Sequence, residues 1–178
     1  MNEDAAIPDT VLPAPLVALA RRVIAANIKA NRRIVVAESC TGGLVSAALT
    51  EIAGSSATFE AGFVTYSNAQ KTAMLGVSED VLDTFGAVSI ATAWAMAQGA
   101  LNRSEADVAV SITGVAGPDG GSEMKPVGTV VFARAERGDD SENAVADLRR
   151  FDDTGRANIR VQAALCALEL LLPDEAEA

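Results

Sequence analysis

Apolar residues along this chain follow two kinds of pattern, one typical of amphipathic helices and the other of buried strands. Apolar side chains three and four positions apart predict helices over residues 16–30, 44–52, 68–75, 78–85, 89–101 and 156–172. Short runs rich in valine and isoleucine predict strands over residues 33–37, 59–66, 107–113, 128–135 and 144–151. We expect the last two strands to form an antiparallel hairpin with an acidic tip at 137–142. The alternation predicts an α/β protein, a three-layer α/β/α sandwich with a mixed β-sheet.

The length of the chain predicts a single domain. Its 178 residues, 49% of them hydrophobic, suffice for one substantial core but not for two of ordinary size. We expect the domain to occupy residues 15–172, between an acidic, proline-containing leader (1–14) and an acidic tail (173–178). Aromatic residues make up only 4%, so alanine and branched aliphatic side chains must fill the core.

Composition also limits the partners and the compartment. No apolar run approaches the roughly 18 residues that a membrane helix needs, and the leader lacks the basic-then-apolar form of a signal peptide. Two cysteines, Cys40 and Cys166, are too few for a disulfide framework or a four-sulfur metal site. The net charge of −10 argues against nucleic acid, because phosphate contacts require a basic surface. We therefore expect a cytoplasmic protein that binds neither membrane nor nucleic acid.

The chain contains no histidine, which excludes several classes of hydrolase. Ser-His-Asp and Cys-His catalysis, histidine-ligated zinc and the HExxH peptidases are all ruled out. Any proton transfer must use Lys, Tyr, Asp, Glu or Cys. Most of the positive charge is arginine, and the lysines are Lys29, Lys71 and Lys125.

The segment Ala-Glu-Ser-Cys-Thr-Gly-Gly, residues 37–43, lies where a predicted strand turns into a predicted helix. Open α/β sheets bind ligands at the carboxyl ends of their strands, and helix N-termini attract anions. Two interpretations of Ser39 and Thr41 therefore remain. In the first, one of them is a nucleophile or a phosphate ligand. In the second, both only cap the following helix, and Gly42 and Gly43 allow the chain to bend.

Two further segments contain candidate chemistry. Lys71 is either an ordinary solvated lysine or a base whose pKa burial has lowered, with Tyr66 five residues earlier to orient a proton. The glycine-dense segment 113–121, which includes Gly114, directly follows an apolar strand. Such a loop lets backbone N–H groups converge on an anion, or lets the main chain approach a ligand closely.

Seven short motifs together carry a family resemblance that spacing alone does not supply. They are Ala37-Glu38-Ser39-Cys40-Thr41-Gly42-Gly43, Gly54-Ser55-Ser56, Tyr66-Ser67-Asn68 with Lys71, Leu75-Gly76-Val77, Gly86-Ala87-Val88-Ser89, Thr113-Gly114-Val115-Ala116-Gly117-Pro118 and Lys125-Pro126-Val127-Gly128-Thr129. In this order, from about residue 33 to residue 135, the chain resembles the CinA C-terminal domain family. It is similar to the stand-alone, single-domain form of that family, the nicotinamide-nucleotide amidohydrolases.

The resemblance implies hydrolysis of a small-molecule nucleotide: nicotinamide mononucleotide and water give nicotinate mononucleotide and ammonia, without metal or cofactor. It further implies that Ser39 is the nucleophile, that Lys71 is its general base and that Tyr66 assists in the same proton network. Thr113 would contact the substrate, and an arginine of the terminal helix would bind the phosphate. We select Arg156 for that role. A homo-oligomer is also implied.

The sequence departs from the family pattern just before the last helix. Relatives typically read Phe-x-Gly-Asp-Arg there, whereas residues 151–156 are one residue longer and lack the Gly-Asp pair.

Our own inference from chemistry is that backbone N–H groups around Thr41, Gly42 and Gly43 stabilise the oxyanion of the reaction.

Two alternative functions remain open. The first is an amidase whose nucleophile is Cys40, acting with Glu38 and Lys71; if the strand continues, Glu38 and Cys40 point to one side and Ser39 to the other. The second is a non-catalytic nucleotide-binding protein with a role in competence or damage responses. It would keep the glycine-rich loops but would not require Lys71.

Overall fold

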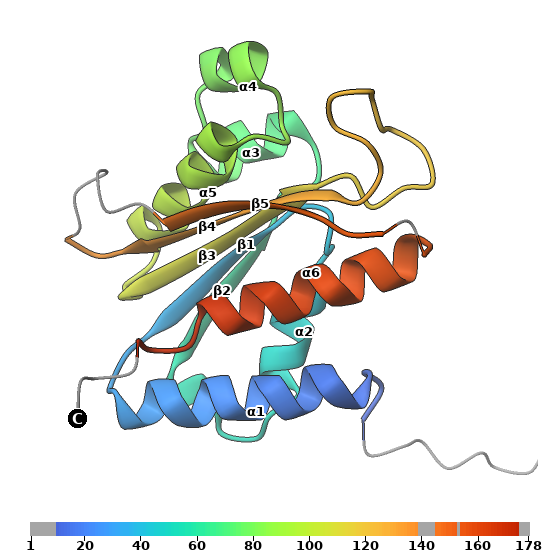
Figure 1. Cartoon of the computed structure of the whole chain (residues 1–178). Helices are drawn as coiled ribbons and strands as arrows, with labels where there is room; N and C mark the ends of the chain where they lie inside the picture. The colour runs from blue at the N-terminus through green and yellow to red at the C-terminus, as the bar shows by residue number, and fades with distance from the viewer. Residues whose placement is uncertain (1–9, 139–144, 153, 175–178) are drawn as a thin grey trace, which may run out of the picture.

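A five-stranded sheet runs through the middle of the computed structural model, which describes residues 10–138, 145–152 and 154–174 (Figure 1). The strands are β1 (Ile34–Glu38), β2 (Phe59–Val64), β3 (Val108–Gly114), β4 (Thr129–Glu136) and β5 (Val145–Arg150). Their order across the sheet is β2-β1-β3-β4-β5. β1 is parallel to both β2 and β3, whereas β4 is antiparallel to β3 and β5. The predicted mixed sheet and its terminal hairpin are thus confirmed. Of the predicted acidic tip, 137–142, residues 139–142 lie outside the described residues.

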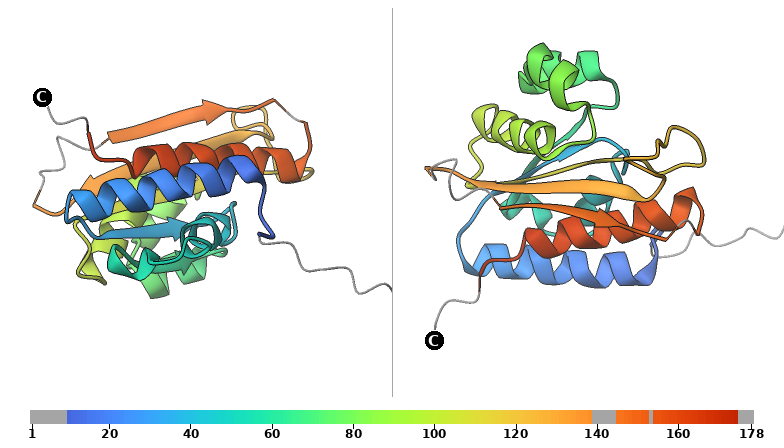
Figure 2. Two further views of the ribbon diagram at one scale, coloured as in Figure 1. Left: turned by 90° about the horizontal axis from the view of Figure 1, so that it is seen from below. Right: turned by 45° about the horizontal axis from the view of Figure 1, so that its top comes forward.

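Helices cover both faces of this sheet, as Figures 1 and 2 show. One layer contains α1 (Ala14–Lys29), α2 (Leu44–Thr50) and α6 (Arg156–Leu170). The other contains α3 (Asn68–Leu75), α4 (Glu79–Phe85) and α5 (Ile90–Asn102). The three-layer α/β/α arrangement is therefore confirmed. A short 3₁₀ helix, η1 (Ser55–Ala57), which the apolar pattern did not predict, leads into β2.

Successive residues of the central strands alternate between two hydrophobic cores. On β1, Ile34 and Val36 belong to the core beneath α1, α2 and α6, whereas Val35 and Ala37 belong to the core beneath α5. The α5 core is lined by small side chains: its buried alanines on the helix are Ala93, Ala97 and Ala100. Small side chains on both surfaces let the helix lie close to the sheet, which explains how so few aromatic residues suffice.

The layer of α3 and α5 contains one very close backbone contact. A Cβ atom on Gly99 of α5 would lie 2.1 Å from the carbonyl oxygen of Leu75 at the end of α3. Only glycine leaves room there, so Gly99 sets how near α3 approaches α5. Since α3 also carries Lys71, this contact affects the candidate site.

The predicted leader and tail fall mainly on residues 1–9 and 175–178, which lie outside the described residues. α1 begins at Ala14, with Pro13 as its N-cap residue and Pro15 within its first turn. Among the described residues, no helix is long and apolar enough to span a membrane.

Candidate active site

A cavity of about 290 Å³ lies at the carboxyl ends of the three parallel strands, β2, β1 and β3. Residues from each of the segments singled out above line it. They are Ser39, Cys40, Tyr66, Asn68, Lys71, Ala87, Val88, Thr113, Gly114, Val115, Ala116, Gly117, Asp119, Gly120 and Arg156. The sheet thus brings together positions that are far apart in the sequence.

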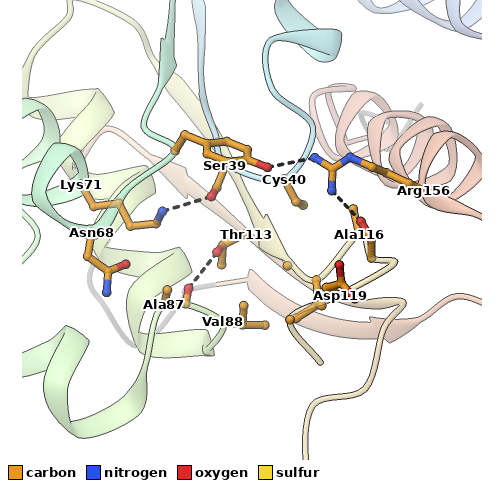
Figure 3. Close-up of a pocket in the computed structure, with 15 residues that line it drawn as sticks. Ser39, Cys40, Asn68, Lys71, Ala87, Val88, Thr113, Ala116, Asp119 and Arg156 are labelled. Atoms are coloured by element: carbon orange, nitrogen blue, oxygen red, sulfur yellow. Dashed lines mark hydrogen bonds between the residues drawn. The ribbon is translucent and has the colours of Figure 1, made fainter. Parts of the chain in front are cut away.

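Ser39 and Lys71 are in direct contact at one end of this cavity (Figure 3). The Nζ atom of Lys71 donates to the Oγ atom of Ser39 over 3.0 Å and to the carbonyl oxygen of Thr65 over 2.9 Å. Ser39 follows β1 directly, and Lys71 comes from the buried face of α3, so both side chains rest on rigid elements.

Lys71 is 1% exposed, which is unusual for a lysine. Among the described residues it forms no ion pair with a carboxylate. Burial without a counter-charge disfavours the ammonium form, and desolvation therefore lowers the pKa of Lys71 from its usual value of 10.5. A lysine in this state is equipped to accept a proton from the Ser39 hydroxyl.

Glu38 is fully buried but points away from Lys71, to the start of α2. Its carboxylate accepts hydrogen bonds from the backbone N–H groups of Gly43 (3.0 Å), Val45 (3.1 Å) and Ser46 (2.8 Å), and from the Ser46 hydroxyl (2.6 Å). Gly43, the N-cap residue of α2, has no side chain to serve as a cap. Glu38 supplies that cap from the preceding strand.

Cys40 also lines the cavity, yet its surroundings keep the thiol protonated. Burial, assisted by the negative charge of Glu38, raises the pKa of Cys40 to about 12. The expected alternation is observed, since Cys40 belongs to the core on the α2 side whereas Ser39 contacts Lys71 on the α3 side. The set Cys40, Glu38 and Lys71 is therefore not assembled, because the Glu38 carboxylate is committed to α2.

Arg156 enters the cavity from the opposite end, at the first turn of α6 (Figure 3). Its guanidinium donates to the carbonyl oxygen of Gly117 (2.8 Å) and to the hydroxyl of Tyr66 (2.9 Å). The longer lead-in therefore still directs Arg156 to the site. Tyr66 is 61% exposed, and its hydroxyl is bonded to Arg156 rather than to Lys71 or Ser39.

The remaining predicted residues separate into two groups. Thr113 and Gly114 line the cavity, and the hydroxyl of Thr113 donates to the carbonyl oxygen of Ala87 over 2.7 Å. Thr41, Gly42 and Gly43 are not among the lining residues.

Two of the three proposed oxyanion donors of this turn, the N–H groups of Gly42 and Gly43, are already engaged. The N–H of Gly42 bonds to the carbonyl oxygen of Ser39 (3.0 Å), and that of Gly43 bonds to Glu38. We therefore withdraw the expectation that the Gly42 and Gly43 amides stabilise the oxyanion, because each N–H is already bonded to an oxygen atom of the protein.

No individual role was predicted for eight of the lining residues, which are Asn68, Ala87, Val88, Val115, Ala116, Gly117, Asp119 and Gly120. One signal for Asn68 was available, since it lies three positions before Lys71 and such positions share a helix face. Asp119 and the 87–88 segment enter the site through the packing of loops, which no local periodicity describes.

The part of the chain that the structure describes contains no group of three or more His, Cys, Asp or Glu side chains placed to hold a metal ion.

Comparison with known proteins assigns the chain to a family. The model of the CinA C-terminal domain matches residues 16–174, which is nearly the whole described chain. The chain belongs to the CinA C-terminal domain family. The resemblance seen in the seven motifs is thereby confirmed, and it extends over α1 and α6 as well.

Relatives in the CinA C-terminal domain family include proteins named as enzymes. The nicotinamide-nucleotide amidohydrolase PncC of Pseudomonas putida is 47% identical over 158 residues, covering 89% of this chain and 96% of that protein. The PncC of Enterobacter agglomerans is 52% identical over 136 residues, covering 76% of this chain and 80% of that protein. Some other relatives are longer, and the chain matches about a quarter of their length.

A solved structure agrees with the fold. The competence/damage inducible protein CihA of Agrobacterium tumefaciens superposes with a TM-score of 0.86 at 49% identity, covering 91% of this chain and 96% of that one. Names in this family thus refer to an enzymatic activity in some members and to competence or damage in others.

Proposed function

We propose that this chain is a nicotinamide-nucleotide amidohydrolase, which converts nicotinamide mononucleotide and water to nicotinate mononucleotide and ammonia. The observation that carries the proposal is the 3.0 Å contact between Ser39 and an almost fully buried Lys71. The substrate is inferred from the relatives that are named for this activity. The non-catalytic alternative does not require Lys71, and burying this lysine without a carboxylate partner costs stability.

The first half of the reaction begins with a neutral Lys71. Once Nζ is neutral, the direction of its contact with Ser39 reverses, and the Ser39 hydroxyl donates to the lone pair of Nζ. Oγ then attacks the carboxamide carbon while its proton moves to Nζ. The tetrahedral intermediate collapses as the C–N bond breaks. Lys71 returns the proton to the departing nitrogen, which leaves as ammonia, and Ser39 is left as an ester of the pyridine carboxyl group.

The second half repeats these transfers with water. Lys71 takes a proton from the attacking water, whose oxygen forms a new bond to the carbonyl carbon. The ester bond to Oγ then breaks, and Lys71 returns the proton to Oγ. Nicotinate mononucleotide departs, and both residues regain their starting states without any metal or redox step.

The side chains at the two ends of the cavity match the two ends of the substrate. Arg156 lies at the end opposite Lys71 and Asn68 (Figure 3), and we assign it to the phosphate. With the phosphate there, the carboxamide extends toward Ser39. Asn68 has the amide group to hydrogen-bond this carboxamide, and Thr113 lines the cavity between the two ends. The Tyr66 hydroxyl is bonded to Arg156, so we assign Tyr66 to positioning that guanidinium.

The direct test is product analysis with the purified protein. We expect equal amounts of ammonia and nicotinate mononucleotide from nicotinamide mononucleotide, and much slower turnover of free nicotinamide, which lacks the phosphate. Binding of the nucleotide without ammonia release over a broad pH range would instead support a non-catalytic nucleotide-binding protein.

A further inference from the structure

The turn that carries Ser39 lies between two charged side chains that the reaction above does not use. Glu38 binds the N–H groups where the turn enters α2, and Arg160 of α6 donates from Nη2 to the carbonyl oxygen of Thr41 over 2.6 Å. We propose that Glu38 and Arg160 are positioning residues that clamp this turn and hold Ser39 opposite Lys71. The inference rests on the proposed function, since it assigns these residues to the same site.

The backbone of this turn is one that needs support. Gly42 and Gly43 have φ values of +60° and +91°, in the left-handed region. Glycine adopts these angles freely, but for the same reason it allows many others, so two glycines in a row do not hold a turn rigid. The N–H of Ser39 is held by the carbonyl oxygen of Ile112 in β3 (2.9 Å), so it is the part of the turn after Ser39 that needs contacts from other elements.

Glu38 fixes the side of the turn nearest α2. Its fully buried carboxylate is satisfied by four donors, of which three are backbone N–H groups at the beginning of that helix. Because Glu38 directly precedes Ser39, these bonds tie the residue before the nucleophile to the helix after it.

Arg160 fixes the opposite side of the turn. Its Nη2 atom also lies 3.4 Å from the position of a Cβ on Gly42, so the guanidinium packs against two consecutive residues. Among the described residues Arg160 forms no ion pair with a carboxylate, and its buried Nε has no hydrogen-bond partner. Partial burial of this cation carries a desolvation cost, and the Thr41 carbonyl oxygen is its acceptor. This contact therefore supports a role for Arg160 in holding the turn.

Arg160 and Arg156 occupy the same face of α6, one turn apart, but have different surroundings. Arg156 is exposed and lines the cavity, whereas Arg160 is half-buried and is not among the lining residues. Arg160 therefore reaches the backbone of the nucleophile turn and not the substrate. The two arginines should consequently affect different kinetic constants.

The test compares Arg160→Gln with Arg156→Gln. We expect Arg160→Gln to lower kcat by about tenfold to a hundredfold, the usual effect of a misplaced reacting group, while KM stays within about twofold. Arg156→Gln should instead raise KM about tenfold or more, because it removes charge-assisted bonds to the phosphate. Arg160→Lys, which keeps one cationic donor, should recover part of kcat. Arg21→Gln, at an exposed position of α1, is the matched control and should leave both constants unchanged.

Two results would overturn the clamp: a KM increase without loss of kcat in Arg160→Gln, which would make Arg160 a substrate ligand, or no change at all.

Amide hydrogen exchange at Gly42 and Gly43 provides a second readout that needs no activity. We expect faster exchange in Arg160→Gln than in Arg21→Gln, and equal exchange refutes the clamp even if the wild-type protein proves inactive. Wild-type inactivity with faster exchange would refute only the proposed reaction. For Glu38, Ser46→Ala removes one of the four bonds and is the milder variant if Glu38→Gln does not fold.

Discussion

At the scale of single residues, burial determines which side chain can act as the base and which as the nucleophile. Desolvation lowers the pKa of Lys71, so that a neutral amine becomes available. The same effect raises the pKa of Cys40 to about 12, so its thiol remains protonated at neutral pH. A hydroxyl activated by an adjacent amine is thus the arrangement that this site favours.

Activity should therefore rise with pH as Lys71 loses its proton. The midpoint of kcat/KM against pH is expected below the ordinary lysine value of 10.5, because the pKa of Lys71 is lowered by burial. Lys71→Arg should lower kcat/KM by at least about a hundredfold, since guanidinium does not give up a proton. An unchanged rate in Lys71→Arg, or a rate independent of pH in the wild type, would remove Lys71 from the mechanism.

The same pKa shift predicts a sign for stability. The folded protein releases the Lys71 proton more readily than the unfolded chain does, so the contribution of this group to the free energy of unfolding increases with pH. The increase falls between the lowered pKa and 10.5, and it should be absent in Lys71→Met.

Local motifs allowed Ser39, Lys71 and Arg156 to be predicted from the sequence, since each belongs to, or closely follows, a recognisable pattern. The partners of Glu38 could not be predicted in the same way. Its position in the motif suggested a member of a catalytic set, but the orientation of α2 turns its carboxylate to the helix N-terminus. Hydrogen-bond partners depend on packing angles, which a residue pattern does not contain.

At the scale of elements, the close contact between α3 and α5 sets the position of α3, the helix that carries the proposed base Lys71. The measurable test is Gly99→Ala, whose new methyl group would meet the Leu75 carbonyl oxygen at 2.1 Å. We expect a loss of about 1–3 kcal/mol in the free energy of unfolding, although alanine favours helix over glycine by about 1 kcal/mol. Because α3 must move, kcat should fall as well.

Chemical denaturation and steady-state kinetics of Gly99→Ala check this expectation. The matched control is Gln98→Ala, which introduces the same residue at the neighbouring, half-buried position of α5. Glutamine and alanine are both good helix formers, so this control should change the free energy of unfolding by less than about 0.5 kcal/mol and leave kcat unaltered. Equal stability of Gly99→Ala and the wild type would mean that α3 is free to shift and does not depend on this contact.

Most elements were predictable, because apolar periodicity responds directly to burial on one face. The helices and strands occur where the pattern placed them, with ends that differ by a few residues. The short helix η1 was missed because three residues are too few to show periodicity. The role of Gly99 was also hidden, since a glycine within an alanine-rich helix does not reveal which backbone it approaches.

At the scale of the whole molecule, the parallel order of β2, β1 and β3 creates the site. Three separate segments of the sequence meet there because the carboxyl ends of these strands share one edge of the sheet. The fold class followed from the alternation of elements. The distribution of donors around the cavity did not, and the withdrawn role of Gly42 and Gly43 illustrates the difference.

The composition of the whole chain leads to a prediction about metals. It has no histidine, and its described residues provide no cluster of three potential ligands, so the Ser39–Lys71 reaction should proceed without a metal ion. Dialysis against EDTA should leave kcat unchanged. A loss of activity that Zn²⁺ or Mg²⁺ restores would contradict the proposed mechanism.

In the proposed reaction, Ser39, activated by Lys71, attacks the amide carbon of nicotinamide mononucleotide. The most direct measurement is the rate of ammonia release by Ser39→Ala and by Cys40→Ala under identical conditions. We predict that Ser39→Ala loses at least about a thousandfold in kcat, whereas Cys40→Ala stays within about threefold of the wild type. Retained turnover in Ser39→Ala, together with its loss in Cys40→Ala, would exclude Ser39 as the nucleophile and identify Cys40 in its place.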